Sequence, residues 1–173
     1  MAYAVVNLDR MSGTEDSSQL LSVRFFDDND EPAAIENGNV VVYGDLITYN
    51  NGGVVTQERE VRKATTPAGT ETLAEIALVA NPELIYDESR RHPLDDYINE
   101  AGQEIRAYRL HQNDGFSVTA EAFSGTPEKG KYVVLGATTK LVVSGTATGT
   151  VIGKIDDVFT LGRHTYYYVV VSL

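Results

Sequence analysis

The segment that most restricts the fold is the C-terminal run RHTYYYVVVSL, residues 163–173. Residues 165–171 are all β-branched or aromatic and none is charged, which is typical of a strand and of an aggregation-prone steric zipper. Alternate residues of a strand face opposite sides, so Tyr166 and Tyr168 would face away from Tyr167. A strand that is apolar on both faces must be covered on both. We therefore expect it to be a central strand, a subunit contact, or both.

Length and charge narrow the class of protein. The chain has 173 residues and no cysteine, so packing or partners must stabilise it without disulfides or thiolate metal sites. Its 25 acidic and 14 basic residues give a net charge of −11, which disfavours nucleic acid and anionic membranes as partners. The sequence has no apolar run long enough to span a membrane, and its first residues do not resemble a secretion signal. We expect a protein made in the cytoplasm that contacts neither nucleic acid nor membrane.

Most local patterns indicate β-structure. VVVYGDLITY (40–49), NNGG (50–53) and VVTQEREVRKA (54–64) together predict a β-hairpin, because a Gly-rich turn joins two strand-like runs. Beyond residue 103, short strand-like segments alternate regularly with Gly-containing turns, a spacing that favours a small sandwich or barrel. The apolar run LAEIALVA (73–80) cannot be assigned from its periodicity.

The sequence predicts a mainly β fold of small barrel or sandwich elements with one short helix and an extended N-terminal segment. The helix is expected near 93–101, because Pro93 suits a first helical turn and a glycine follows the segment. Residues 1–28 are predicted to form an extended arm, since MSGTEDSSQ is too polar to pack alone. Residues 29–125 would form a β-rich body, and residues 126–173 barrel-like strands packed on it.

One segment of the chain resembles a nucleotide-binding motif. GTPEKGK, residues 125–131, matches the first seven positions of a phosphate-binding P-loop. Tyr132 then stands where a Ser or Thr would bind Mg²⁺, and the strand-like YVVLG follows where phosphate binding needs a helix N-terminus. We interpret the segment as a turn that leads into a strand, and we expect no nucleotide or other cofactor.

An acidic run, DDNDEP at residues 27–32, invites comparison with a calcium-binding loop. Counting from its first residue puts Pro32 where the calcium loop needs glycine and Gly38 where it needs a bidentate glutamate. A solvated loop is therefore the favoured interpretation. The histidines show no metal-binding spacing, so each is interpreted as a surface or capping residue. They are His92, His111 and His164.

No catalytic constellation is visible. Ser117 in GFSVT lacks the second glycine and the following helix of a nucleophile elbow. The carboxylate pairs Asp95/Asp96 and Asp156/Asp157 are adjacent in sequence, so their side chains are expected to diverge on a helix or strand. These patterns favour a binding or structural module over an enzyme.

Two parts of the chain resemble phage proteins. The motifs LDDYINEAG, RAYRL and DGFSVT within residues 75–123 resemble head-region structural proteins of tailed bacteriophages and prophages of Firmicutes. Residues 149–173 are similar in pattern to capsid decoration proteins, in which a Gly-bounded strand, a turn and a valine-rich strand close a small barrel. The long middle section departs from that pattern. The resemblance implies a β-rich virion protein and defines no active site.

We therefore expect a non-enzymatic virion protein that decorates or stabilises a phage capsid at its outer surface. Its expected partners are the major capsid protein and further copies of itself. The candidate contacts are Leu20, Leu21, Tyr167 and Tyr168, and we expect one of the two tyrosines to face the core and the other a neighbour. Two alternatives remain: a head-fibre or receptor-binding module whose NNGG or TATGT loop meets a host glycan, and a head–tail or tail adaptor. An enzyme is the last alternative.

Overall fold

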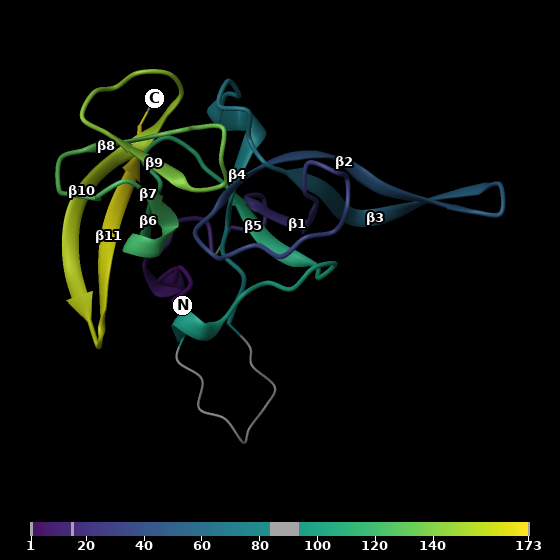
Figure 1. Ribbon diagram of the computed structural model, residues 1–173, viewed down its shortest axis with the longest axis horizontal. Coiled ribbons are helices and arrows are strands. Elements are labelled where there is room, and N and C mark those ends of the chain that lie inside the picture. The colour runs from purple at the N-terminus through teal and green to yellow at the C-terminus, as the bar shows by residue number, and fades with distance from the viewer. Residues whose placement is uncertain (1, 15, 84–93, 173) are drawn as a thin grey trace.

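Five strands close a barrel in the first part of the chain (Figure 1). The computed structural model describes residues 2–14, 16–83 and 94–172. The strand order is β1-β3-β2-β4-β5; β1 runs parallel to β3, and the other neighbours are antiparallel. The strands are β1 (Leu20–Phe25), β2 (Val40–Asn51), β3 (Val54–Thr65), β4 (Ile76–Val79) and β5 (Ile105–Arg109).

A six-stranded sheet in the order β6-β11-β10-β8-β9-β7 follows the barrel along the chain. Its strands are β6 (Gly115–Thr119), β7 (Phe123–Ser124), β8 (Tyr132–Val134), β9 (Leu141–Ser144), β10 (Val151–Leu161) and β11 (His164–Val171). The helical elements in the described part of the chain are four 3-10 turns, η1 (Leu8–Arg10), η2 (Leu73–Glu75), η3 (Leu94–Asp96) and η4 (Ala120–Ala122). The prediction of a mainly β fold is confirmed.

The C-terminal strand β11 is central, because β10 and β6 pair with its two edges. Its alternation is also as expected. Val169 and Val171 are buried in the core between the barrel and the six-stranded sheet, and Tyr166 is buried on the opposite face of β11. There the ring of Tyr166 stacks on Phe159 with 5.6 Å between centroids. Pairing on both edges leaves this aggregation-prone segment no free backbone edge.

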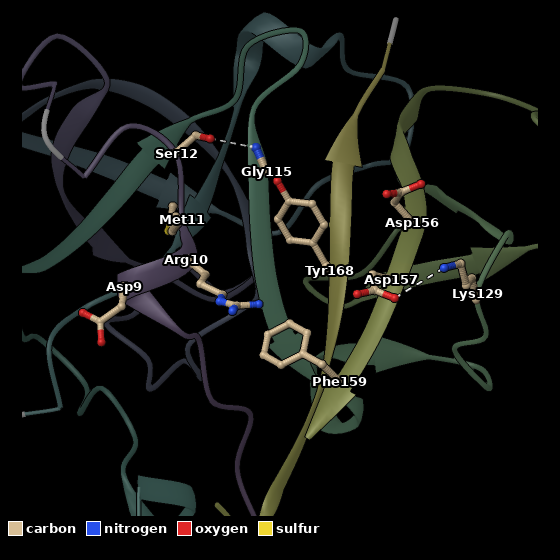
Figure 2. A pocket seen from close by; sticks show the side chains of 10 residues that line it. All are labelled: Asp9, Arg10, Met11, Ser12, Gly115, Lys129, Asp156, Asp157, Phe159 and Tyr168. Carbon is tan, nitrogen blue, oxygen red and sulfur yellow. Dashed lines mark hydrogen bonds and ion pairs between the residues drawn. The ribbon is translucent and has the colours of Figure 1, made fainter. Parts of the chain in front are cut away.

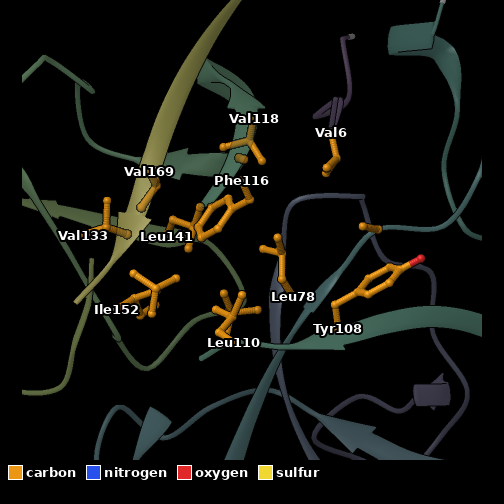
Figure 3. Close-up of a cluster of buried hydrophobic side chains, with 14 of the residues drawn as sticks. Val6, Leu78, Tyr108, Leu110, Phe116, Val118, Val133, Leu141, Ile152 and Val169 are labelled. Atoms are coloured by element: carbon orange, nitrogen blue, oxygen red, sulfur yellow. The ribbon is translucent and has the colours of Figure 1, made fainter. Parts of the chain in front are cut away.

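Two hydrophobic cores share the strands of the barrel. One fills the barrel interior, and the other lies between the barrel and the six-stranded sheet (Figure 3). Strand β4 belongs to both: Ile76 and Leu78 face the second core, whereas Ala77 and Val79 face the barrel interior. Because both of its faces are buried, β4 lacks the polar alternation that would have identified the run at 73–80 as a strand.

The N-terminal residues are packed against the second sheet and do not form the predicted arm. Val5 and Val6 are buried, and Val6 forms a β-bridge with Val118 of β6. The amide of Asn7 donates to the carbonyl of Ser117 at 2.9 Å. This segment covers the outer edge of β6, so its apolar residues outweigh the polar stretch that follows them.

A 3-10 turn, η3, takes the place of the α-helix predicted near 93–101, and Pro93 lies outside the described residues. The backbone of Asn99 instead exchanges two hydrogen bonds with Ile35, at 3.0 and 3.1 Å. The Asn99 side chain also donates to the Asn37 side chain at 3.1 Å, and Tyr97 is buried beside them. These long-range bonds use backbone groups that an α-helix would need for its own ladder.

The change from barrel to sheet falls between β5 and β6, within residues 110–114. The predicted division placed residues 115–125 with the body, whereas β6 and β7 belong to the C-terminal sheet. Likewise, β1 is a barrel strand although most of it lies in the predicted arm. A local pattern reveals that a strand exists, but not which sheet it joins.

Glu83 supplies a stability prediction. Burial raises the pKa of this carboxyl, although the Asn37 side-chain amide donates to it at 3.5 Å. The folded state therefore disfavours the ionised form, and its destabilising effect appears as the pH rises through the raised pKa. We expect Glu83→Gln to melt at a higher temperature than the parent near neutral pH and at about the same temperature near pH 4.

Thermal melts of both proteins at the two pH values test this expectation. Glu100→Gln, at an exposed position, is the matched control and should change little. A lower melting temperature for Glu83→Gln at neutral pH would show that the fold needs the carboxylate charge.

Candidate functional site

The two leucines proposed as partner contacts lie on opposite faces of β1. Leu21 is buried in the barrel core, so it is unavailable to a partner and that prediction is wrong. Leu20 is 36% exposed. Only Leu20 of this pair can contribute to a surface contact, because the pleat turns adjacent side chains to opposite sides.

The two tyrosines proposed as contacts also diverge. Tyr167 packs against the core between the barrel and the six-stranded sheet, and its ring meets Phe123 edge to face with 5.7 Å between ring centroids. Tyr168 lies on the opposite face of β11, over Gly115, where a Cβ atom would overlap its ring. The structure therefore gives Tyr167 a core role and leaves Tyr168 as a candidate contact.

The segment that resembles a P-loop leads into a strand, as predicted. Gly125 has a φ of 100°, and β8 begins at Tyr132, directly after the motif. The Lys131 ammonium pairs with Glu128 at 3.0 Å. The geometry is that of a turn closed by its own side chains, without the helix N-terminus that would hold a phosphate.

The acidic run at 27–32 binds its own backbone. The Asp27 carboxylate accepts the amides of Asn29 and Glu31 at 2.9 and 3.0 Å. Hydrogen bonds from Glu31 and then Asn29 lower the pKa of Asp27. Asp30 has a φ of 65° and pairs with Lys63. This is the arrangement of a solvated turn stabilised by an aspartate.

The histidines within the described residues have separate neighbours. His111 lies 3.6 Å from the Asp114 carboxylate, and His164 meets Tyr166 edge to face. His92 lies outside the described residues. Across residues 2–14, 16–83 and 94–172, no three His, Asp or Glu side chains are placed to hold a metal ion.

A long β-ribbon is the most prominent surface feature (Figure 1). The hairpin prediction is confirmed, since β2 and β3 pair through residues 51 and 54. Gly52 and Gly53 form its turn with φ values of 63° and 92°, as a tight hairpin turn requires. The ribbon extends well beyond the barrel strands in Figure 1.

The outer part of this ribbon, residues 48–57, is called here the ribbon tip. Val54 and Val55 are 66% and 69% exposed, and as neighbours in a strand they face opposite sides. Residues 46–57 contain no charged side chain, although 23% of the chain is charged. The tip is therefore an uncharged protrusion from an acidic protein, and it exposes two apolar side chains.

An open pocket of about 690 Å³ lies beside β11, on the face of the six-stranded sheet that points away from the barrel (Figure 2). Phe159 and Tyr168 supply ring surface from β10 and β11, and the segment around η1 forms one wall. The Arg10 guanidinium lies 4.6 Å from the centre of the Phe159 ring. Lys129 pairs with Asp157 at 3.3 Å on the opposite wall. The N-terminal segment thus helps to build the pocket.

A β-bulge brings two adjacent carboxylates to this pocket. Ile155 is opposite Val169 and Asp157 is opposite Tyr168, so Asp156 is the extra residue of β10. Asp156 and Asp157 both line the pocket. The prediction that these two side chains diverge is wrong here, because a bulge interrupts the two-residue alternation and re-aims a side chain.

Sequence reasoning missed this pocket for two reasons. Its walls come from residues 9–12, 115, 129 and 156–168, which are far apart in the chain. The bulge also has no signature in the sequence around Asp156. The local signal was the two-residue alternation, which predicted that one of Tyr167 and Tyr168 would face away from the core.

Comparison with known proteins gives no match: no family model, curated protein or solved structure resembles the chain significantly. In the part of the chain that the structure describes, no helix is long and apolar enough to cross a membrane.

Proposed function

We propose that this chain is a non-enzymatic structural protein of a bacteriophage virion that binds the outer surface of the capsid and stabilises it. The ribbon tip carries the proposal. A two-stranded ribbon alone is only marginally stable in water, and this one exposes Val54 and Val55 on its two faces. A neighbouring protein that covers the tip would bury this apolar surface. Depletion of charge is also typical of the buried centre of an interface.

The proposed partners are the major capsid protein and, on the particle, neighbouring copies of this chain. Binding to assembled shells in preference to loose subunits would stabilise the shell by mass action. Many copies on one particle would multiply the effect. The net charge of −11 suits the outer surface, since an inner surface would meet DNA phosphate.

Particles assembled without this chain should bind the purified protein and rupture at a higher temperature. The double variant Val54→Thr/Val55→Thr keeps the β-branched shape but removes apolar surface, so we expect its affinity for particles to fall about tenfold or more. Co-sedimentation and particle melting curves measure both effects. Leu94→Thr changes an exposed apolar residue outside the ribbon and is the control.

Three results would contradict the proposal in different ways. No binding to particles would remove the capsid as partner, and an unchanged rupture temperature at saturating binding would remove the stabilising role. Equal affinity of the parent and the double variant would remove the ribbon tip as the contact.

A further inference from the structure

The pocket beside β11 has hydrogen-bonding groups that the protein itself leaves unused. No hydrogen bond within the described residues involves the Tyr168 hydroxyl, and no described carboxylate pairs with Arg10. Asp9 and Asp156 likewise have no ion-pair partner among the described residues. Ser12 accepts the Gly115 amide at 2.9 Å, which leaves its hydroxyl proton free to donate.

The pocket places hydrogen-bond donors and acceptors on either side of an aromatic surface. Arg10 and Tyr168 can donate hydrogen bonds to a ligand from one side of the pocket, and the Asp156 carboxylate can accept hydrogen bonds from a ligand on the other (Figure 2). Phe159 and Tyr168 offer apolar ring surface between them. A fitting ligand must therefore carry closely spaced groups that both donate and accept, together with apolar faces.

Charge further restricts the ligand. Three carboxylates and two cations line the pocket, namely Asp9, Asp156, Asp157, Arg10 and Lys129. The carboxylates outnumber the cations, and together with the net charge of −11 they disfavour an anionic ligand. The volume of about 690 Å³ lies within the usual range for small-molecule sites.

We infer that this pocket binds an uncharged saccharide, with hydroxyl groups on Asp156, Arg10 and Tyr168 and a sugar face on the aromatic rings. Each sugar hydroxyl donates and accepts, which matches the donors and acceptors of the walls. The β-bulge at Asp156 is part of the site, because it turns a second carboxylate into the pocket. The inference does not depend on attachment to a capsid.

The full-length purified protein is the material for the test. A printed array of neutral and acidic oligosaccharides identifies the best neutral ligand, and calorimetry then measures its affinity. Asp156→Asn keeps the side-chain size and removes the charge, and we expect it to weaken binding about tenfold or more. Tyr168→Phe keeps the ring and should weaken binding severalfold. Gly115→Ala should also weaken binding, because the added Cβ would displace the Tyr168 ring.

Asp28→Asn is the matched control, since it removes an exposed carboxylate in the acidic loop. It should bind like the parent, and melting curves should show that all variants are folded. Three outcomes would overturn the inference: no neutral saccharide binds, acidic saccharides bind more tightly than their neutral counterparts, or Asp156→Asn and Tyr168→Phe bind as the parent does. Because no particle is involved, failure here leaves capsid binding to be judged by its own experiment.

Discussion

Truncation of the chain after His164 should yield insoluble or unfolded protein. The deletion removes almost all of β11, and with it the backbone hydrogen bonds to β10 and β6. It also removes the buried side chains of Tyr166, Val169 and Val171. Burial of each contributes about 1.5–3 kcal/mol. Together with two newly exposed strand edges, the loss is comparable to the 5–15 kcal/mol that typically separates a folded domain from its unfolded state.

The soluble fraction after expression and the circular dichroism of any soluble material measure this outcome. Truncation after Val171 leaves β11 whole and is the control, which should remain soluble. A soluble His164 truncation with a native β spectrum would show that β10 and β6 do not need the central strand.

Deletion of residues 2–12 should also destabilise the fold strongly. Val5, Val6 and Met11 are buried, so their loss costs roughly 4.5–9 kcal/mol if each contributes about 1.5–3 kcal/mol. The deletion also uncovers the edge of β6, because the amide of Thr119 donates to the Val5 carbonyl at 3.0 Å. We expect a much lower melting temperature or aggregation during expression.

Thermal unfolding followed by circular dichroism checks this expectation. Ser17→Ala, in the exposed polar stretch that follows, should melt like the parent. An unchanged melting temperature after the deletion would restore the earlier interpretation of this segment as an arm that lies free of the body.

Local sequence was sufficient where the structure depends on neighbouring residues. The β2–β3 hairpin follows from two strand-like runs and the pair Gly52–Gly53, whose positive φ values fit the tight turn. The composition of β11 predicted a central strand, a subunit contact, or both, because a strand apolar on both faces needs cover on both. The contrast between Tyr167 and Tyr168 also follows from the two-residue period.

Other features depend on contacts between distant parts of the chain. The 3-10 turn that replaces the predicted helix is accompanied by the pairing of Asn99 with Ile35. The polar residues after Met11 suggested an arm, although the residues before it pack on β6. In each case a local preference worth a fraction of a kcal/mol per residue is outweighed by burial and long-range hydrogen bonds.

The candidate sites divide in the same way. The sequence by itself determined the ribbon, its glycine turn and its uncharged tip, because a hairpin is specified by residues that are adjacent in the chain. Only the tertiary structure decided that the pocket exists. It requires the bulge at Asp156 and the packing of Arg10 on Phe159, two residues separated by most of the chain. Strand propensity and alternation are local properties, whereas the register of a bulge and the cover of a sheet edge are set by the partners that the folded chain brings together.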